Sequence, residues 1–348
     1  MKKKIALITG VNGQDGAYLA RYLIDKGYHV LGTVRSLNSN YSRLEYMNVL
    51  SEIKIIECNL LESGSLDRLL KKHSDISEIY NLAAISFVHT TFDQPYLTFE
   101  TNSLPLITML ELIRYKYKHI KLYQASTSEI YGNNGIKVMD EESLKLPVSP
   151  YAISKLTSFQ LIRMYREAYG IFCCNGILFN HESPLRGELF VTKKITKSLA
   201  RYALGLNREN KIGNIFSKRD WGYAGDFVEG MHMILQHKKP DDYVLATNKT
   251  HTIKDFIDIS LDHLKIRFKW IGDNDKNMKC IDTKNNKVIF RTHKDFYRPL
   301  DLTYLKGNYS KAKKVLGWRP KTNLNNLIKK MIEFDLVNEK KTIVKKNY

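Results

Sequence analysis

The sequence predicts an α/β fold in which a doubly wound parallel sheet is followed by a smaller C-terminal domain. In the first half of the chain, short apolar runs alternate with longer amphipathic runs. This alternation of strand and helix patterns is typical of parallel sheets covered by helices. Beyond Phe172 the alternation gives way to polar, turn-rich stretches, so the second domain is expected there.

Size and composition limit the possible number of domains and the possible classes of protein. The chain has 348 residues, 43% of them hydrophobic, which suits one large domain or two coupled domains with a sizeable core. The N-terminus runs from Met1 through three lysines into a strand pattern, and no apolar run is long enough to span a bilayer. We therefore expect a cytoplasmic protein with no signal peptide and no membrane contact. The four cysteines lack C-x-x-C spacing, which favours reduced thiols and no metal site.

The formal net charge of +19 raises the question of nucleic-acid binding. The lysines are scattered along the chain, however, and no nucleic-acid-binding motif is present. We expect no nucleic-acid partner. A basic surface suits an anionic small substrate, such as a nucleotide diphosphate, equally well.

The first strand and the loop after it predict a dinucleotide site of the Rossmann type. The apolar run Ile5–Thr9 is followed by Gly10-Val-Asn-Gly13-Gln-Asp-Gly16 and by a helix pattern over Tyr18–Lys26. Glycines at this spacing permit a tight turn and a close approach of backbone to phosphate, and the helix N-terminus favours the negative charge. A loop without ligand could carry the same glycines, but the position between strand and helix favours binding. The predicted cofactor contacts here are Gly10, Asn12, Gly13, Gln14, Asp15 and Gly16.

The next elements extend the same pattern. We expect strands over 29–33, 53–58 and 79–84, a fifth strand beginning at 120–124, and helices over 65–72 and 102–115. The second strand ends at Val34-Arg35, and an arginine at that position suits the 2′-phosphate of NADP, whereas an acid would suit the ribose of NAD. NADP is therefore the predicted cofactor. Further contacts are predicted at the strand ends, namely Arg35, Asn59, Leu60, Leu82, Ala83 and Ala84.

The predicted catalytic residues lie at the end of the fifth strand and on the helix after it. Tyr151 and Lys155 are four residues apart, so they share one face of a helix. A phenol ionises near pH 10, and a nearby ammonium favours the phenolate, so Tyr151 could act as a base nearer neutral pH. Thr127 and Glu129 leave the strand end pointing the same way. A tyrosine and lysine at this spacing are often only a surface helix face, so the assignment depends on the rest of the chain.

The remaining segments set the domain boundaries. A basic helix is expected over Val191–Leu204, and we expect residues 180–188 to form turns. We predict an NADP-binding domain over 1–179, with a returning segment near 212–250, and a mainly substrate-binding domain over 180–336. Residues 337–348 are rich in lysine and are expected to form a basic tail.

Several motifs together resemble those of extended short-chain dehydrogenase/reductases, and specifically of GDP-mannose 4,6-dehydratases. The resemblance covers nearly the whole chain, and the Gln-Asp-Gly and Asn-His-Glu-Ser-Pro pieces are its most specific parts. The matching pieces are Thr9-Gly10, Gly13-Gln-Asp-Gly16, Gln124-Ala-Ser-Thr-Ser-Glu129-Ile-Tyr-Gly132, Ser149-Pro-Tyr151 to Lys155, Asn175-Gly-Ile-Leu-Phe-Asn-His-Glu-Ser-Pro184, Arg219-Asp-Trp-Gly222, Arg298-Pro299, Lys311-Ala-Lys and Leu316-Gly-Trp318.

The resemblance implies a role for each matched residue. Tyr151 would be the base at the sugar O4, with Lys155 tuning it and holding the nicotinamide ribose. Thr127 would hydrogen-bond O4, and Glu129 would act at C5 and C6. Arg35 resembles part of an arginine-rich loop that helps to build tetramers, so a homodimer or homotetramer is expected. The implied substrate contacts are Ser86, Ser128, Asn180, Glu182, Val191, Lys194, Arg219 and Arg298.

The implied reaction is the loss of water from a GDP-sugar through an internal redox cycle. Oxidation at C4 to a ketone makes the C5 hydrogen acidic, and Glu129 then removes that proton while O6 leaves as water. Return of the hydride to C6 gives a GDP-4-keto-6-deoxy sugar with no net use of NADP. A dehydrogenase needs only the tyrosine and lysine, whereas elimination needs a second acid/base such as Glu129.

Departures from the family pattern leave alternatives open. Ile85 stands where glutamine is usual, and Leu185 stands where the first of two arginines is usual. Both lie in stretches expected to line the sugar–diphosphate site, so GDP-D-glycero-D-manno-heptose is an alternative substrate to GDP-mannose. An NADP-dependent GDP-4-keto-sugar reductase or epimerase is a second alternative, and a non-catalytic NADP-binding regulator is a third. Ser36 after Arg35, where a second arginine is frequent, weakens the expectation of a tetramer.

Overall fold

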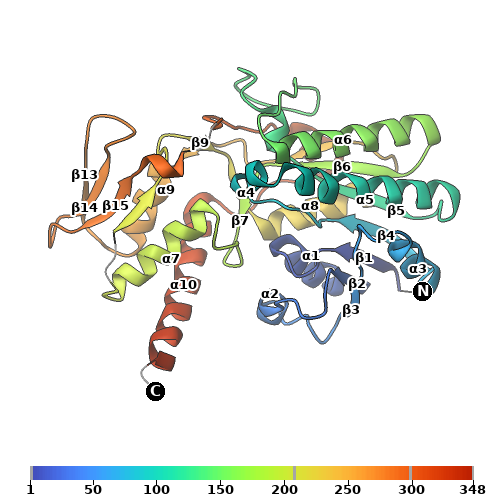
Figure 1. Ribbon diagram of the computed structural model, residues 1–348, viewed down its shortest axis with the longest axis horizontal. Helices are drawn as coiled ribbons and strands as arrows, with labels where there is room; N and C mark the ends of the chain where they lie inside the picture. The colour runs from blue at the N-terminus through green and yellow to red at the C-terminus, as the bar shows by residue number, and fades with distance from the viewer. Residues whose placement is uncertain (1–2, 207–208, 298–299, 347–348) are drawn as a thin grey trace.

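The protein is described by a computed structural model that covers residues 3–206, 209–297 and 300–346. Its larger part is a twisted sheet between two layers of helices, and its smaller part carries a second sheet beside α7, α9 and α10 (Figure 1). The C-terminal helix α10 (Leu324–Lys346) runs out from the body at the lower edge of that view. It includes residues 337–346, which we had expected to form a basic tail.

In the described residues the large sheet has seven strands, all parallel, in the order β11-β6-β5-β4-β1-β2-β3. This confirms the predicted doubly wound α/β fold. The strand order reverses between β1 and β4, and in such sheets ligands bind at the carboxyl ends of the strands beside that reversal. The strands are β1 (Ile5–Thr9), β2 (His29–Val34), β3 (Lys54–Glu57), β4 (Ile76–Asn81), β5 (Lys121–Thr127), β6 (Cys173–Leu178) and β11 (Tyr243–Leu245).

Helices cover both faces of this sheet. Strand residues alternate between faces, so Ala6 and Ile8 of β1 pack under one helical layer and Leu7 packs under the other. Because both faces are buried, most strand residues are apolar and do not alternate with exposed polar residues. One layer contains α1 (Gln14–Asp25) and α8 (Ala224–Gln236), and the other contains α3 (Ser65–Lys72), α5 (Pro95–Tyr115) and α6 (Pro150–Tyr169).

Two boundaries near the carboxyl edge differ from the sequence-based expectation. Helix α1 begins at Gln14 rather than at Tyr18, so Gln14 and Asp15 belong to its first turn. Strand β4 ends at Asn81 rather than at Ala84. The physical reason is the Thr9 hydroxyl, whose Oγ1 accepts hydrogen bonds from the backbone N–H groups of residues 82 and 83 at 3.0 and 3.1 Å. The chain therefore turns over the end of β1 instead of continuing the strand.

The smaller part has its own hydrophobic core, formed by α7, α9, α10 and a four-stranded sheet in the order β13-β14-β15-β8. Residues 180–182 form strand β7, which pairs in parallel with β10, rather than the turn expected there. α8 and β11 lie between these segments in the sequence but pack with the large sheet. The bounds are α7 (Val191–Ala203), α9 (Ile253–His263), β7 (Asn180–Glu182), β8 (Asn210–Ile212), β10 (Trp221–Tyr223), β13 (Phe268–Ile271), β14 (Lys279–Asp282) and β15 (Val288–Thr292).

Short elements complete the described chain. They are α2 (Ser42–Tyr46), α4 (Val88–Asp93), the antiparallel pair β9 (Lys218–Arg219) and β12 (His251–Thr252), the 3₁₀ turns η1 (Ser128–Tyr131) and η2 (Lys294–Phe296), and the π-helical turn η3 (Ala312–Leu316). No helix within residues 3–206, 209–297 and 300–346 is long and apolar enough to cross a membrane. The same residues contain no cluster of His, Cys, Asp and Glu side chains that could hold a metal ion.

Candidate active site

The N-terminus of α6 places the predicted tyrosine and lysine at the carboxyl edge of the sheet. Ser149 caps the helix, because its Oγ accepts a hydrogen bond from the backbone N–H of Ala152 at 3.1 Å, and Pro150 opens the first turn. Tyr151 therefore lies in the first turn, and Lys155 follows one turn later. The Lys155 ammonium is buried and donates to the carbonyl oxygen of Ala125 in β5 at 2.9 Å. This bond fixes α6 against the end of the central strand.

The end of β5 brings Thr127 and Glu129 to the same place. Thr127 is the last strand residue, and its Oγ1 accepts the backbone N–H of Glu129 at 3.2 Å, which starts the turn η1. The Thr127 hydroxyl and the Glu129 carboxylate both act on the Tyr151 phenol, the first lowering its pKa and the second raising it. Three of the four predicted catalytic side chains thus converge, and Lys155 lies one turn along the same helix.

Burial controls the acidity of this cluster. Burial raises the pKa of Tyr151 to about 12, assisted by the Glu129 and Asp15 carboxylates and opposed by the Thr127 hydroxyl and by Arg186. We expected the Lys155 ammonium to lower this pKa, and in the protein alone the opposite shift is found, because desolvation dominates. Burial lowers the pKa of Lys155 to about 8, although the Asp15 carboxylate opposes that shift.

A chain of buried side-chain hydrogen bonds connects the cofactor edge to Lys155. The Thr9 hydroxyl donates to Asn81 Oδ1 at 2.8 Å, Asn81 Nδ2 donates to Gln124 Oε1 at 2.7 Å, and Gln124 Nε2 donates to the Ala125 carbonyl at 3.0 Å. Thr9 Oγ1 already accepts two backbone N–H groups, so its single proton must go to Asn81. This fixes the orientation of both amides. Ala125 O is therefore shared by the Gln124 amide and the Lys155 ammonium.

The glycine loop fits a dinucleotide phosphate. Gly10 has a φ of +66°, and a Cβ there would lie 3.0 Å from Ala83 Cα, so the loop and the end of β4 approach closely. A Cβ on Gly16 would lie 2.6 Å from the Gly10 carbonyl oxygen. No described side chain caps the start of α1 at Gly13, so its first N–H groups can receive an anion.

Gln14 and Asp15 offer only their backbones to this loop, because their side chains are bonded to β7 and the residues after it. The carbonyl of Asn12 accepts a hydrogen bond from Nη1 of Arg43 at 3.2 Å, and Arg43 Nε donates to the Leu185 carbonyl at 2.9 Å. The sequence analysis did not identify Arg43, whose partners are 31 and 142 residues away along the chain. Its only sequence signal is its place at the end of the polar loop after β2.

The other predicted cofactor residues follow the strands β2, β3 and β4. Arg35 is exposed directly after β2, and Asn59 is exposed after β3, where its Oδ1 accepts the N–H of Leu61 at 3.2 Å. Leu60, Leu82 and Ala84 are half-buried near the carboxyl edge. These residues lie along one edge of the sheet, as the positions of the strand ends required.

The predicted substrate contacts divide into two groups. Asn180 and Val191 are half-buried, Lys194 and Ser86 are exposed, Ser128 is buried, and Asn180 Oδ1 has no hydrogen-bond partner among the described residues. Others are tied to the protein itself. The buried carboxylate of Glu182 accepts from Thr192 Oγ1 at 2.6 Å and pairs with Arg186, while Arg219 donates to the carbonyls of residues 218 and 302. Arg298 lies outside the described residues.

The two departures from the family pattern lie in different environments. Leu185 is 6% exposed and belongs to the core cluster beneath α1 and α8, so its side chain packs inside the protein. Ile85 is half-buried, and its backbone is bonded at both ends to the Asn102 amide of α5, at 2.8 and 3.1 Å. Of the two, only Ile85 retains an exposed portion large enough to face a ligand.

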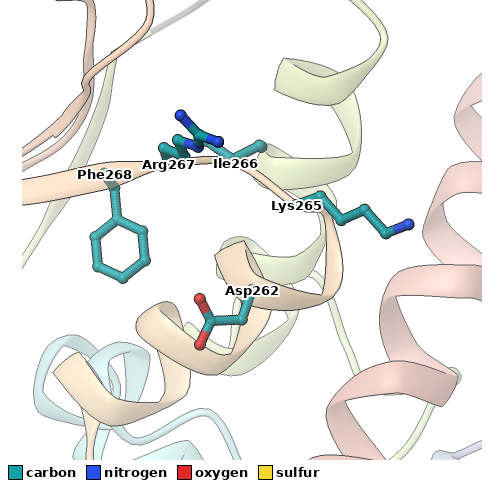
Figure 2. A pocket seen from close by; sticks show the side chains of 5 residues that line it. All are labelled: Asp262, Lys265, Ile266, Arg267 and Phe268. Atoms are coloured by element: carbon teal, nitrogen blue, oxygen red, sulfur yellow. The ribbon is translucent and has the colours of Figure 1, made fainter.

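A separate surface hollow of about 450 Å³ lies where α9 leads into β13. Figure 2 shows its lining, in which Arg267 and Phe268 extend to opposite sides of the strand and Lys265 extends away from both. None of the predicted site residues lines it. We assign it no role in the candidate site.

Comparison with known proteins agrees with this geometry. A family model described as GDP-mannose 4,6 dehydratase matches residues 7–331. A curated relative named GDP-mannose 4,6 dehydratase from Dictyostelium discoideum is 40% identical over 345 residues, covering 96% of each chain. GDP-mannose 4,6 dehydratase 1 from Arabidopsis thaliana is 42% identical, covering 96% of this chain and 90% of that one.

Solved structures share the fold at lower identity. UDP-glucose 4-epimerase from Thermotoga maritima, solved with UDP-glucose, superposes with a TM-score of 0.80 at 21% identity and covers 97% of this chain and 99% of its own. dTDP-glucose 4,6-dehydratase from Bacillus anthracis, solved with NAD, has a TM-score of 0.78 at 20% identity, with coverages of 97% and 98%. The full-length matches show that the chain belongs to the GDP-mannose 4,6-dehydratase family.

Proposed function

We propose that this protein is a hydro-lyase that converts GDP-mannose to GDP-4-keto-6-deoxymannose and water. The observation that carries the proposal is the Glu129 carboxylate beside the Tyr151 phenol, at the carboxyl end of the central strand. An enzyme that only transfers hydride needs no second acid/base at this position, whereas loss of water does. The family match supports the same reaction.

The catalytic side chains act at different carbons of the sugar. Tyr151, whose pKa the Thr127 hydroxyl lowers, takes the proton from the C4 hydroxyl as C4 becomes a ketone. The ketone acidifies the hydrogen at C5, which Glu129 removes as a proton and passes to the C6 hydroxyl, so that it leaves as water. C5 regains a proton when C6 is reduced. Lys155 holds a positive charge at the end of β5, where it favours the Tyr151 phenolate. C4 is oxidised and C6 is reduced, so the overall reaction consumes no reductant.

We infer that the cofactor is a nicotinamide dinucleotide, and specifically NADP. When bound, it accepts a hydride from the sugar and later returns it. The close approach of Gly10 to Ala83 and the open N-terminus of α1 support a dinucleotide phosphate in that loop. The exposed guanidinium of Arg35 directly after β2 supports a 2′-phosphate over a free ribose.

We also propose that Asn180, Val191, Lys194 and Arg298 contact the GDP portion of the substrate, and that the enzyme works in the cytoplasm as a homodimer or homotetramer. Exposed apolar side chains on α5 and α6 support self-association, since surface patches of this kind often mark interfaces. They include Tyr96, which is 78% exposed, with Phe99, Leu104, Ile153 and Met164. Sedimentation of the purified protein at micromolar concentration tests the oligomeric state.

Incubation of the purified enzyme with GDP-mannose and catalytic NADP is expected to give a product lighter by one water, with no net NADPH formation. Mass spectrometry and the absorbance of NADPH measure both outcomes in one reaction. A reductase or epimerase would instead consume NADPH or leave the mass unchanged. A non-catalytic regulator would bind the cofactor and form no product.

The main alternative substrate is GDP-D-glycero-D-manno-heptose, which differs from GDP-mannose beyond C6. Ile85, in place of the usual glutamine, is the residue that raises this alternative, because it is half-buried in a stretch expected to line the sugar–diphosphate site. Measuring kcat/KM for both substrates decides between them. A preference for the heptose of more than about tenfold, or about 1.4 kcal/mol in transition-state binding, would overturn the hexose assignment.

A further inference from the structure

The two most specific sequence motifs of the chain bind each other. Gln14 Nε2 donates to the His181 carbonyl at 3.1 Å, and the Ser183 hydroxyl donates to Gln14 Oε1 at 2.8 Å. His181 Nε2 lies 2.8 Å from Asp15 Oδ2, and Gln14 Nε2 also reaches Asp15 Oδ1 at 3.0 Å. The first turn of α1, beside the predicted phosphate site, is therefore joined by side chains to β7, which carries Asn180.

Both ring nitrogens of His181 lie against oxygen atoms. Its Nδ1 lies 2.8 Å from the Phe179 carbonyl oxygen, which can only accept a hydrogen bond, so Nδ1 must donate. Its Nε2 faces a carboxylate, which is also an acceptor when ionised. The pKa of Asp15 is lowered and that of His181 is raised, so the shared proton lies on Nε2 and the ring is an imidazolium paired with Asp15. No ring nitrogen is left to act as a base, which leaves His181 a structural role.

Aromatic packing holds the imidazolium in place from the other side. The ring stacks on Phe227 of α8, with centroids 4.7 Å apart and planes 21° apart, and Phe227 in turn meets Trp318 edge to face. Gly222 of β10 makes room for this stack, since a Cβ there would lie 2.3 Å from the Phe227 ring. Motifs from four separate stretches of the sequence thus meet in one buried column.

We propose that Asp15 and His181 form a positioning pair that holds β7, and with it Asn180, in register with the cofactor loop. The inference rests on the proposed function, because it assigns Asn180 to the nucleotide portion of the substrate. When the pair is intact, His181 Nε2 joins β7 to Asp15 of α1, while Nδ1 is bonded to the nearby Phe179 carbonyl and orients the ring. Loss of the imidazolium proton removes the bond to Asp15 and leaves the Gln14 hydrogen bonds to the His181 carbonyl and to Ser183, so the substrate strand is held less firmly relative to the loop.

The groups around the pair determine the directions in which the pKa values of His181 and Asp15 are shifted. Burial lowers the pKa of His181, but the Asp15 carboxylate and the Phe179 carbonyl together raise it above its ordinary value, against a smaller opposing effect of Arg186. Burial likewise raises the pKa of Asp15, but His181, Gln14 and Arg186 together lower it below its ordinary value. Asp15 also interacts electrostatically with Tyr151 and Lys155 of α6 and with Tyr123 of β5. Removing the Asp15 charge must therefore lower the pKa of His181.

The test measures GDP binding by calorimetry at saturating NADP, from about pH 6 to about pH 9, the range in which histidines titrate. In the wild type, affinity for GDP should fall as pH rises through the pKa of His181. D15N keeps the size of the side chain and a hydrogen-bonding partner for His181 but removes the negative charge. In this variant the fall in GDP affinity should occur at a pH lower by about one unit or more. H181Q should lose this pH dependence, whereas H29Q, at an exposed histidine on the opposite edge of the sheet, should keep it.

A second readout keeps the outcomes distinct. The Cε1 proton signal of His181, assigned by its absence in H181Q, should titrate at lower pH in D15N than in the wild type. Coincident GDP-binding profiles for wild type and D15N would overturn the positioning role while leaving the proposed function intact. If the wild type does not bind GDP at any pH, the proposed function fails, and with it the assignment of β7 as the substrate strand.

Discussion

E129Q is expected to abolish formation of the 4-keto-6-deoxy product while leaving the first oxidation intact. Glutamine keeps the size of the side chain but cannot take the C5 proton, so turnover should fall by about 100- to 10,000-fold. The Glu129 charge also raises the pKa of Tyr151, so its removal does not hinder ionisation of the phenol. A single turnover should therefore leave the cofactor reduced, in an amount equal to the enzyme.

Two measurements separate this outcome from simple damage to the site. Stopped-flow absorbance should show reduction of the cofactor without its reoxidation. Exchange of solvent deuterium into C5 should occur in the wild type and not in E129Q. E142Q, which changes an exposed carboxylate in the loop after β5, serves as the matched control and should behave as wild type. Unchanged turnover in E129Q would remove Glu129 from the mechanism.

K155M is expected to remove activity and to stabilise the protein at the same time. Activity should fall by about 100-fold or more, because the cation that favours the phenolate is lost. Stability should rise, because the ammonium is almost completely buried and burial lowers its pKa to about 8. The Ala125 carbonyl is not orphaned by the substitution, since Gln124 still donates to it.

The sign of the stability effect follows from the protons bound in each state. Between pH 8 and the ordinary value of 10.5, the unfolded chain holds the Lys155 proton and the folded protein has released it. The free energy of unfolding therefore rises with pH across this window, and below pH 8 the full cost of the buried ammonium is present. That cost is about 3 kcal/mol at neutral pH, which is the shift multiplied by about 1.4 kcal/mol per pH unit.

Scanning calorimetry at one scan rate measures the difference directly. At neutral pH, K155M should melt a few degrees above the wild type, and the gap should narrow as pH rises above about 8. K238M changes an exposed lysine outside the site and should alter neither activity nor the pH dependence of melting. A lower melting temperature for K155M at neutral pH would contradict the cost assigned to the buried charge.

The catalytic residues show which features of the site can be predicted from local sequence patterns. The spacing of Tyr151 and Lys155 predicted a shared helix face, and the strand pattern before Thr127 predicted a sheet edge, because both depend on periodicity within a few residues. The acidity of Tyr151 could not be predicted in the same way. It depends on burial and on carboxylates brought from α1 and η1, which reverse the shift expected from Lys155 alone.

The sequence by itself determined the α/β fold, the glycine loop, the family resemblance and the identity of the candidate catalytic side chains. These follow from propensities, periodicities and motifs that are complete within short stretches of chain. Only the tertiary structure decided that Asp15 pairs with His181, that Gln124 and Lys155 share one carbonyl, and that Arg43 joins the loop to Leu185. These partners are up to 166 residues apart, so no local pattern records them, and folding alone brings them within hydrogen-bonding distance.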